Sequence, residues 1–187
     1  MRRTVIAAMV LALSLGLATW APAKGFPPKA ACWQTDNNGD YLTLSLKSMG
    51  KVTTRDGATA IYSVNGVYIY YLGADYYFSI PITGTGYVDP AHGWFHSSVT
   101  GAFHDGLDTW VLGVETFTYP DGSGSEYVVF TGGSSGSSAW GYDDTFASTS
   151  CGNISLEARS VPPGALAQSL TARAAASPPL PRPEGRK

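Results

Sequence analysis

The sequence predicts an all-β fold: a single antiparallel β-barrel of eight or nine strands, closed by one disulfide. Apolar and polar residues alternate in short runs, and turn-forming residues separate these runs at intervals typical of barrels and sandwiches. The two cysteines, Cys32 and Cys151, stand at the two ends of this region. A bridge between them favours a barrel, which leaves no exposed strand edge. A β-sandwich is the alternative, since Pro81 favours an edge strand or a bulge.

Residues 1–23 have the pattern of a secretory signal peptide. Arg2 and Arg3 precede an apolar run from Val5 to Leu17, and Ala21-Pro22-Ala23 offers small residues where a signal peptidase reads. The apolar run is too short to span a bilayer comfortably, and no second one follows. We therefore expect a secreted or periplasmic protein without an integral membrane segment after cleavage of the signal.

Three further regions follow the signal peptide. Residues 24–31 are predicted to be a linker, 32–156 the β domain, and 157–187 a disordered tail rich in proline and alanine. The tail has almost nothing large to bury, so burial cannot offset the entropy lost on ordering it. A short helix over 165–176 is the most structure that we expect there, and nothing visible in the sequence holds it.

The cysteines are predicted to form a disulfide, because export takes the chain to an oxidising compartment. The bridge closes a loop of more than a hundred residues between Cys32 and Cys151. Loop-closure entropy then predicts a stabilisation of about 4–5 kcal/mol. Bridged Cα atoms lie only about 4.4–6.8 Å apart. The first and last strands must therefore be neighbours.

The β domain is strongly acidic. Between Cys32 and Leu156, three basic residues stand against twelve acidic ones, so the formal net charge is 3 − 12 = −9. Such a surface repels phosphate groups, which excludes nucleic acid and anionic membranes as partners of this region. The formal charge of −2 for the whole chain conceals this, because both ends of the chain are basic.

The first strands follow from local patterns. Leu42, Leu44 and Leu46 alternate with polar residues or tyrosine, which predicts a half-buried strand. Asn65-Gly66 is the strongest short hairpin signal, because both residues tolerate the positive φ of a type I′ turn. Gly73-Ala74 is predicted as the next two-residue loop. Together these loops place the following side chains on a core face: Ala60, Tyr62, Val64, Val67, Ile69, Tyr71, Tyr76, Phe78, Ile80 and Ile82.

The opposite face of the same strands is rich in tyrosine. It is predicted to hold Thr59, Ile61, Ser63, Tyr68, Tyr70, Leu72, Asp75, Tyr77, Ser79 and Pro81. Later strands are predicted at 94–99 and 102–105 around a Thr100-Gly101 turn, at 109–119 and 126–131 around a loop, and within 146–156.

Trp33-Gln34-Thr35-Asp36, followed by Asn38-Gly39 and an alternating strand, resembles the first strand of the calycins, the lipocalin and avidin-like barrels. The resemblance covers about fifteen residues and implies a barrel of calycin-like size. The glycine that usually stands two positions before the tryptophan is absent, and no later motif extends the match. No binding residue is carried over.

The tyrosine-rich face predicts a ligand-holding barrel interior, a subunit interface or a protein-binding patch, because such rings favour an apolar neighbour with a hydrogen-bond acceptor nearby. Aromatic surface is plentiful and clustered acid–base groups are scarce, so we expect a non-catalytic binding protein without a cofactor. Its ligand is a small apolar or saccharide molecule, or a protein partner. The candidate ligand-binding residues are Tyr68, Tyr70, Tyr77, Trp94 and Trp110. Cross-strand pairing of aromatic residues on an exposed surface is the plainer interpretation.

The three histidines fall within thirteen residues and motivate an alternative. With a three-residue loop over 99–101, His96 faces His104 across a hairpin; with a two-residue loop, it faces Asp105. His96, His104 and Asp105 are therefore a candidate metal site, and a metal-assisted or hydrolytic enzyme is the alternative function. No spacing here matches a recognised zinc signature, and hydrogen-bonded or exposed histidines are the ordinary interpretation.

Two weaker motifs have ordinary interpretations. Ser134 lies in Gly-Gly-Ser-Ser-Gly, which matches a hydrolase nucleophile motif but is predicted to be a flexible loop, because no helix begins there. Asp36, Asn38 and Asp40 alternate like calcium ligands, but Lys47 stands where a bidentate glutamate belongs, so we predict a turn.

A structural envelope module that oligomerises through its tyrosines is a third candidate function.

Overall fold

The computed structural model describes residues 26–55, 57–73, 76–132, 138–149, 151, 162 and 164–176. The predicted signal peptide and Ser134 lie outside these residues. The described elements are β1 (Ala30–Thr35), β2 (Tyr41–Thr54), β3 (Gly57–Gly73), β4 (Tyr76–Val88), β5 (Phe95–His104), β6 (Thr109–Thr118), β7 (Gly124–Gly132), β8 (Ser138–Ser148) and α2 (Ala165–Ala176). No helix in the described ranges is long and apolar enough to cross a membrane.

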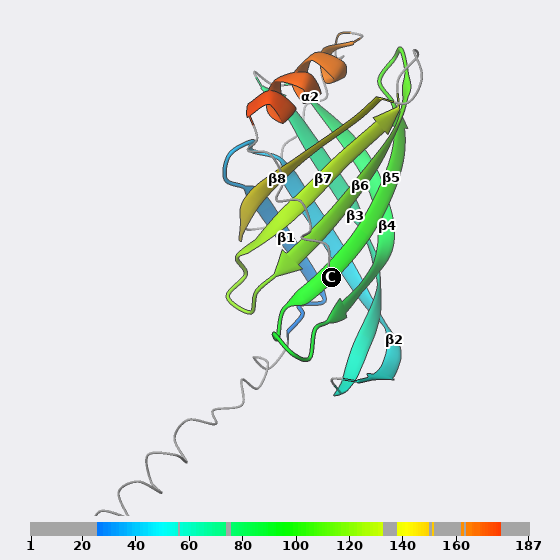
Figure 1. The fold of residues 1–187 in the computed structure, drawn as a ribbon, viewed down its shortest axis with the longest axis vertical. Helices are drawn as coiled ribbons and strands as arrows, with labels where there is room; N and C mark the ends of the chain where they lie inside the picture. The colour runs from blue at the N-terminus through cyan, green and yellow to red at the C-terminus, as the bar shows by residue number, and fades with distance from the viewer. Residues whose placement is uncertain are drawn as a thin grey trace, which may run out of the picture.

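The eight strands form one closed antiparallel barrel, which confirms the predicted fold (Figure 1). Each strand pairs with the next, and β1 closes the ring by pairing Trp33 with Ser148 and Thr35 with Phe146. The predicted disulfide is also confirmed: Cys32 and Cys151 are bridged, with their Cα atoms 5.3 Å apart. Strand closure and the bridge therefore join the same two ends of the sheet.

Alternate side chains of the strands point into the barrel and fill it, except in the second half of β2, where residues 47–54 are exposed. Eight-stranded barrels are just wide enough for side chains to occupy the interior. The largest fully buried side chains are Trp110, Tyr68, Tyr70, Tyr142, Phe95, Phe130, Leu42, Ile80, Leu112, Leu166, Leu170 and Glu126. The described interior is thus mainly aromatic and aliphatic, with one buried glutamate among its largest residues.

The predicted hairpin at Asn65-Gly66 is wrong, because β3 runs straight through it. Gly66 pairs with Leu44 on β2 and with Ile82 on β4. A Cβ atom added at Gly66 would lie 1.8 Å from the carbonyl oxygen of Thr43. Gly66 therefore permits two strands to approach closely, which is a frequent role of glycine inside barrel strands.

The predicted turn at Thr100-Gly101 is wrong for the same reason. Strand β5 is continuous from Phe95 to His104, and a Cβ atom at Gly101 would lie 2.4 Å from the carbonyl oxygen of Pro81. At both glycines, the backbone of a neighbouring strand lies unusually close within the barrel wall.

The missing hairpin changes which side chains share a face. Tyr70 pairs with Phe78, and Tyr71 pairs with Tyr77, one residue away from the predicted register. Val64, Tyr68, Tyr70, Ile80 and Ile82 are consequently in the core, whereas Tyr71 is exposed. The two predicted faces are therefore a mixture of inward and outward residues, since a slip of one residue exchanges the faces of a strand.

Replacing Gly66 with alanine is expected to cost about 1–3 kcal/mol, because the new methyl group meets backbone that cannot move aside. Gly113→Ala on β6 is the matched control: a Cβ there has no heavy atom within 4 Å. We expect the control to change the free energy of unfolding by less than about 0.5 kcal/mol. Urea denaturation of both variants measures this, and equal losses would contradict the close-approach role of Gly66.

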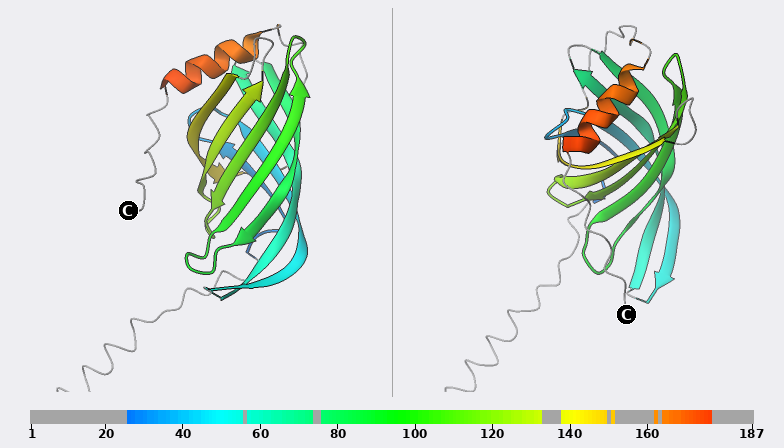
Figure 2. Two further views of the ribbon diagram at one scale, coloured as in Figure 1. Left: turned by 45° about the vertical axis from the view of Figure 1, so that its right-hand side comes forward. Right: turned by 45° about the horizontal axis from the view of Figure 1, so that its top comes forward.

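The helix predicted over 165–176 forms with these bounds as α2, but the expectation that nothing holds it is wrong. Figure 2 shows α2 lying across one end of the barrel. Leu166 and Leu170 are fully buried in the same core cluster as the barrel residues. The side chains of Ser169 and Arg173, on the same helix face, also contact the barrel.

Candidate functional sites

The five predicted ligand-binding residues are not brought together. Tyr68, Tyr70 and Trp110 are buried in the barrel interior. Tyr77 packs outside the barrel against a small cluster of Cys32, Tyr41 and Ile69. Trp94 precedes β5, where its indole nitrogen donates to Asp89 at 3.2 Å. Of the predicted tyrosine-rich face, Tyr68 and Tyr70 therefore lie in the barrel interior and Tyr77 lies outside it.

The predicted metal set is not assembled either, because His96 lies far along β5 from the neighbouring His104 and Asp105. His96 and His104 lie eight positions apart on one strand, which corresponds to roughly 26 Å, and not across a hairpin. The His96 ring stacks on Phe117 with centroids 4.6 Å apart, and His104 Nδ1 accepts a hydrogen bond from the backbone of Gly106. In the described part of the chain, no three His, Cys, Asp or Glu residues are grouped to hold a metal ion.

Asp105 has a structural environment. Its carboxylate accepts hydrogen bonds from the backbone nitrogens of Leu107 and Asp108 and from the indole nitrogen of Trp110. Burial acts to raise the pKa of Asp105, but these hydrogen bonds outweigh it and lower the pKa. The carboxylate thus stays ionised and organises the β5–β6 loop.

A buried polar cluster that the sequence analysis missed lies beneath α2. Its centre is Asp40, which follows the β1–β2 turn and is completely buried. Asp40 Oδ2 accepts hydrogen bonds from the hydroxyls of Tyr68 and Tyr142 at 2.9 and 2.8 Å. Asp40 Oδ1 accepts one from the backbone nitrogen of Tyr71 at 2.7 Å. The β1–β2 turn, β3 and β8, which are far apart in the sequence, therefore meet at one carboxylate.

Arg173 of α2 completes this cluster. Its guanidinium donates through both terminal nitrogens to the two carboxylate oxygens of Asp40, and also to Tyr142 Oη and the carbonyl oxygen of Tyr71. The guanidinium carbon lies 3.9 Å from the ring centroid of Tyr70, in the geometry of a cation–π contact. Desolvation acts to lower the pKa of Arg173, but the hydrogen bond and charge of Asp40 raise it. Arg173 is therefore held as a cation.

Glu126 joins this cluster through the contact between its Oε1 atom and the Tyr68 hydroxyl. Burial, and then the charge of Asp40, raise the pKa of Glu126 to about 8. Its Oε2 atom is buried and has no hydrogen-bond partner among the described residues. Such an environment keeps the carboxyl group protonated at neutral pH.

The hydroxyl protons of the cluster fit this protonation state. Tyr68 Oη lies 2.9 Å from both Asp40 Oδ2 and Glu126 Oε1, yet it carries only one proton. A neutral Glu126 carboxyl supplies the second proton for these two contacts. Burial raises the pKa of Tyr70 to about 12 and raises those of Tyr68 and Tyr142 well above their usual value. With Asp40 paired to Arg173, the cluster carries no net charge.

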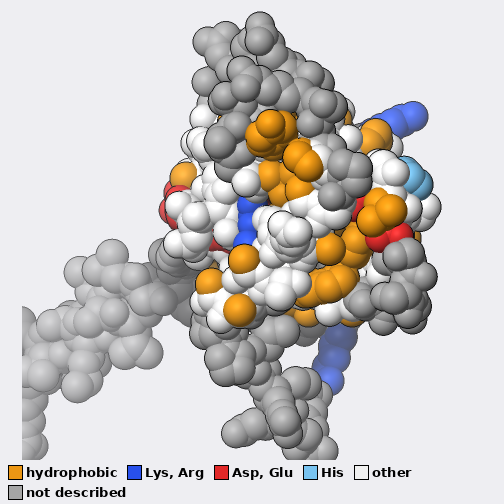
Figure 3. All heavy atoms as spheres, turned by 90° about the horizontal axis from the view of Figure 1, so that it is seen from above, with side chains coloured by type: hydrophobic (Ala, Val, Ile, Leu, Met, Phe, Trp, Pro, Cys, Tyr) orange, Lys and Arg blue, Asp and Glu red, His pale blue; other side chains and the backbone are white. Residues whose placement is uncertain are grey.

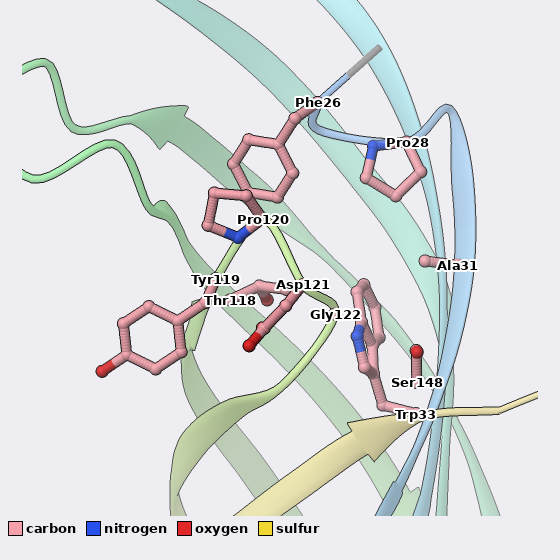
Figure 4. A pocket seen from close by; sticks show the side chains of 10 residues that line it. All are labelled: Phe26, Pro28, Ala31, Trp33, Thr118, Tyr119, Pro120, Asp121, Gly122 and Ser148. Carbon is pink, nitrogen blue, oxygen red and sulfur yellow. The ribbon is translucent and has the colours of Figure 1, made fainter. Parts of the chain in front are cut away.

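A cleft of about 300 Å³, at the lower limit of small-molecule pockets, lies at the end of the barrel away from α2. Figure 4 shows its lining from close by. Trp33 and Ser148 form one wall, and Phe26 stands over Pro120 on the other. Thr118 also lines the cleft, and its buried hydroxyl has no hydrogen-bond partner among the described residues. The cleft is lined by Phe26, Pro28, Ala31, Trp33, Thr118, Tyr119, Pro120, Asp121, Gly122 and Ser148.

A second cleft, of about 330 Å³, lies beside α2. It separates part of the helix from the ends of β3 and β4 and is lined by Leu72, Tyr76, Pro162, Ala165, Gln168 and Ser169. Seen from this end, the described surface shows hydrophobic side chains among uncharged ones, a basic side chain near the middle and acidic side chains toward the edge (Figure 3).

One signal in the sequence could have indicated the docking of α2. Leu166, Ser169, Leu170 and Arg173 are spaced by three, one and three residues, which places them on one helix face. No local pattern identifies Asp40 as the partner of Arg173, because 133 positions separate them.

No family model, curated protein or solved structure matches this chain.

Proposed function

We propose that the chain is an exported, non-catalytic binding protein that holds a small apolar or saccharide ligand in the cleft between Phe26 and Trp33. The cleft itself carries this proposal: aromatic rings and prolines form its walls, and the carboxyl of Asp121 and the hydroxyl of Ser148 border it. Flat apolar walls with a few polar groups are typical of sites for such ligands. A disulfide suits an oxidising compartment and supports export.

The distribution of titratable groups supports binding over catalysis. The Asp40 carboxylate is occupied by Arg173 and two tyrosines, and it is completely buried. Glu126 is only 2% exposed. Neither group lines either of the two clefts described above, and Asp105 is engaged by its own loop. The ligand site of this proposal therefore needs shape, aromatic contact and a few hydrogen-bonding groups, and no acid–base catalyst.

Ligand binding is expected to change the fluorescence of Trp33, which forms one wall of the cleft. Titration with fatty alcohols, monosaccharides and disaccharides should give a saturable shift in emission with one of these classes. The conservative variant Trp33→Phe should lose that signal and keep the fold. A flat emission response across the whole panel would contradict the proposal.

Phe26→Ala is expected to weaken the same ligand about tenfold, because an aromatic contact contributes roughly 1 kcal/mol or more. Phe117→Ala is the matched control, since Phe117 is also half-buried but lies on the outer wall against His96. Isothermal titration calorimetry measures both affinities. Equal affinity of wild type and Phe26→Ala for the ligand would place the site elsewhere.

A further inference from the structure

The β2–β3 hairpin extends beyond the barrel wall as a two-stranded ribbon, formed by residues 47–55 and 57–60. Strand β1 pairs with β2 only as far as Ser45, and β4 pairs with β3 only from Ile61 onward. Figure 1 shows these ends of β2 and β3 projecting at the end of the barrel away from α2. The β2 part of the ribbon is exposed throughout. Its apolar side chains include Met49 and Val52, which are 64% and 43% exposed.

The ribbon also holds the positive charge of the β domain. All three basic residues between positions 32 and 156 lie within 47–55, and all twelve acidic residues of that region lie outside 47–55, the nearest being Asp56. The formal charge is therefore +3 on the ribbon and −12 on the remainder. A surface charged in this way attracts an acidic partner. The three basic residues, all exposed, are Lys47, Lys51 and Arg55.

The outer wall beside the ribbon carries a strip of aromatic rings. Tyr87 on β4 pairs with His96 on β5, which pairs with Phe117 on β6, so their rings lie in a row across three strands. Trp94 extends the row, because its ring centroid lies 5.7 Å from that of Phe117 and 5.9 Å from that of Tyr119. The aromatic strip consists of Tyr87, His92, Trp94, His96, Phe117 and Tyr119.

The aromatic strip is partly open to solvent and has acidic groups at its border. Tyr87 is 39% and Tyr119 40% exposed. Asp89 Oδ2 lies 3.0 Å from His92 Nδ1, and the Glu115 side chain, beside His96, is 52% exposed. Aromatic residues are enriched at protein interfaces, and the faces of their rings attract lysine and arginine. The strip therefore complements the ribbon in both charge and apolar character.

The two complementary surfaces adjoin each other on one molecule. The hydroxyl of Thr59, in the ribbon, donates to the carbonyl oxygen of Val88 at the end of β4. A Cβ atom added at Gly57 would lie 4.0 Å from Cβ of Pro90, in the loop that carries His92 and Trp94. Adjoining complementary surfaces can meet reciprocally about a two-fold axis, and such a contact closes at a dimer.

Direct pairing of two ribbons through their strand edges is disfavoured. It would bring the lysines of both copies together, and a bulge between Ser48 and Gly50 interrupts the edge of β2. Lysines and bulges are the devices by which natural proteins block edge-to-edge pairing. A second copy would therefore meet the ribbon through side chains.

We propose that the chain forms a two-fold dimer in which the ribbon of each copy lies on the aromatic strip of the other. Met49 and Val52 of one copy contact the rings of the second. The basic side chains of the ribbon face the rings and the acidic border formed by Asp89 and Glu115. This inference goes beyond the proposed ligand binding and does not rest on it.

Analytical ultracentrifugation of the purified protein tests the dimer. Wild type should show a monomer–dimer equilibrium. Lys51→Glu should weaken the dimer at least about tenfold, because it places like charges together twice in a two-fold contact. Glu115→Lys should weaken it by a similar factor. The matched control is Asp143→Lys, which makes the same change of net charge at an exposed position on β8 and should not weaken the dimer.

The double variant Lys51→Glu/Glu115→Lys should recover most of the wild-type affinity, since opposite charges face each other again. A monomer at every concentration up to millimolar would overturn the proposal, including the case in which the ribbon binds an acidic peptide instead. A dimer that Lys51→Glu leaves intact would overturn it too. Equal weakening by Glu115→Lys and Asp143→Lys would also overturn it, because the strip would then not be the contact.

Discussion

Replacing Glu126 with glutamine is expected to stabilise the protein by about 3 kcal/mol at neutral pH. The folded state raises the pKa of Glu126 from 4.5 to about 8. At pH values between these two, the unfolded chain releases the proton and the folded chain keeps it. The free energy of unfolding then falls by about 1.4 kcal/mol for each pH unit of increase. Glutamine is neutral in both states and avoids this loss.

The direction in which stability changes with pH makes the measurement specific to a raised pKa of Glu126. The stability linked to Glu126 is fully present below about pH 4.5 and is lost progressively as pH rises toward 8. In urea denaturation, the difference between Glu126→Gln and wild type should therefore be small at low pH and grow steadily toward pH 8. Glu115→Gln is the control, because the Glu115 side chain is 52% exposed. Parallel stability curves for wild type and Glu126→Gln would contradict a neutral, buried carboxyl.

Removing the disulfide is expected to cost about 4–5 kcal/mol of stability. The bridge joins residues 119 positions apart, and loop-closure entropy in the unfolded chain grows with this separation. It also lies at the seam where β1 and β8 close the barrel. That seam has a short ladder of three residue pairs, Trp33–Ser148, Gln34–Ala147 and Thr35–Phe146. The bridge therefore reinforces a junction that only a short strand ladder holds.

The double variant Cys32→Ser/Cys151→Ser tests this by denaturation under non-reducing conditions. Wild type treated with a reductant is the control and should match the variant, since both lack the bridge. Amide hydrogen exchange should show lost protection in β1 and β8 before the other strands. A loss below about 1 kcal/mol, with β1 still protected, would show that the β1–β8 ladder closes the barrel without help.

The fold class could be predicted from the sequence because its two main determinants are local or covalent. Alternation in segments such as Leu42 to Leu46 marks strands, and the pair of cysteines fixes which strands meet. The registers were not predictable in the same way. Gly66 and Gly101 resemble turn residues, but their role is to let a neighbouring strand pass at close range. Such an approach is a property of the closed barrel and has no local signature.

The polar cluster beneath α2 could not be predicted for a related reason. Asp40 lies in a turn of polar residues, where an aspartate is ordinarily exposed. It is buried because α2 returns over the barrel from 133 positions away and supplies Arg173. From the sequence, Tyr68 is predicted to contact a ligand through its ring, and Tyr142 has no predicted role. In the structure, the hydroxyl groups of both residues hold the carboxylate. Only the spacing of the two leucines and the arginine in α2 was available as a signal.

The central claim is that Arg173 and Asp40 hold α2 on the end of the barrel. Hydrogen exchange measured on the α2 amides by mass spectrometry tests it most directly. In wild type, these amides should exchange at least about tenfold more slowly than in an unstructured chain, and Asp40→Asn should remove this protection while β3 to β7 remain protected. Free exchange of α2 in the wild-type protein, or equal protection in Asp40→Asn, would contradict the claim.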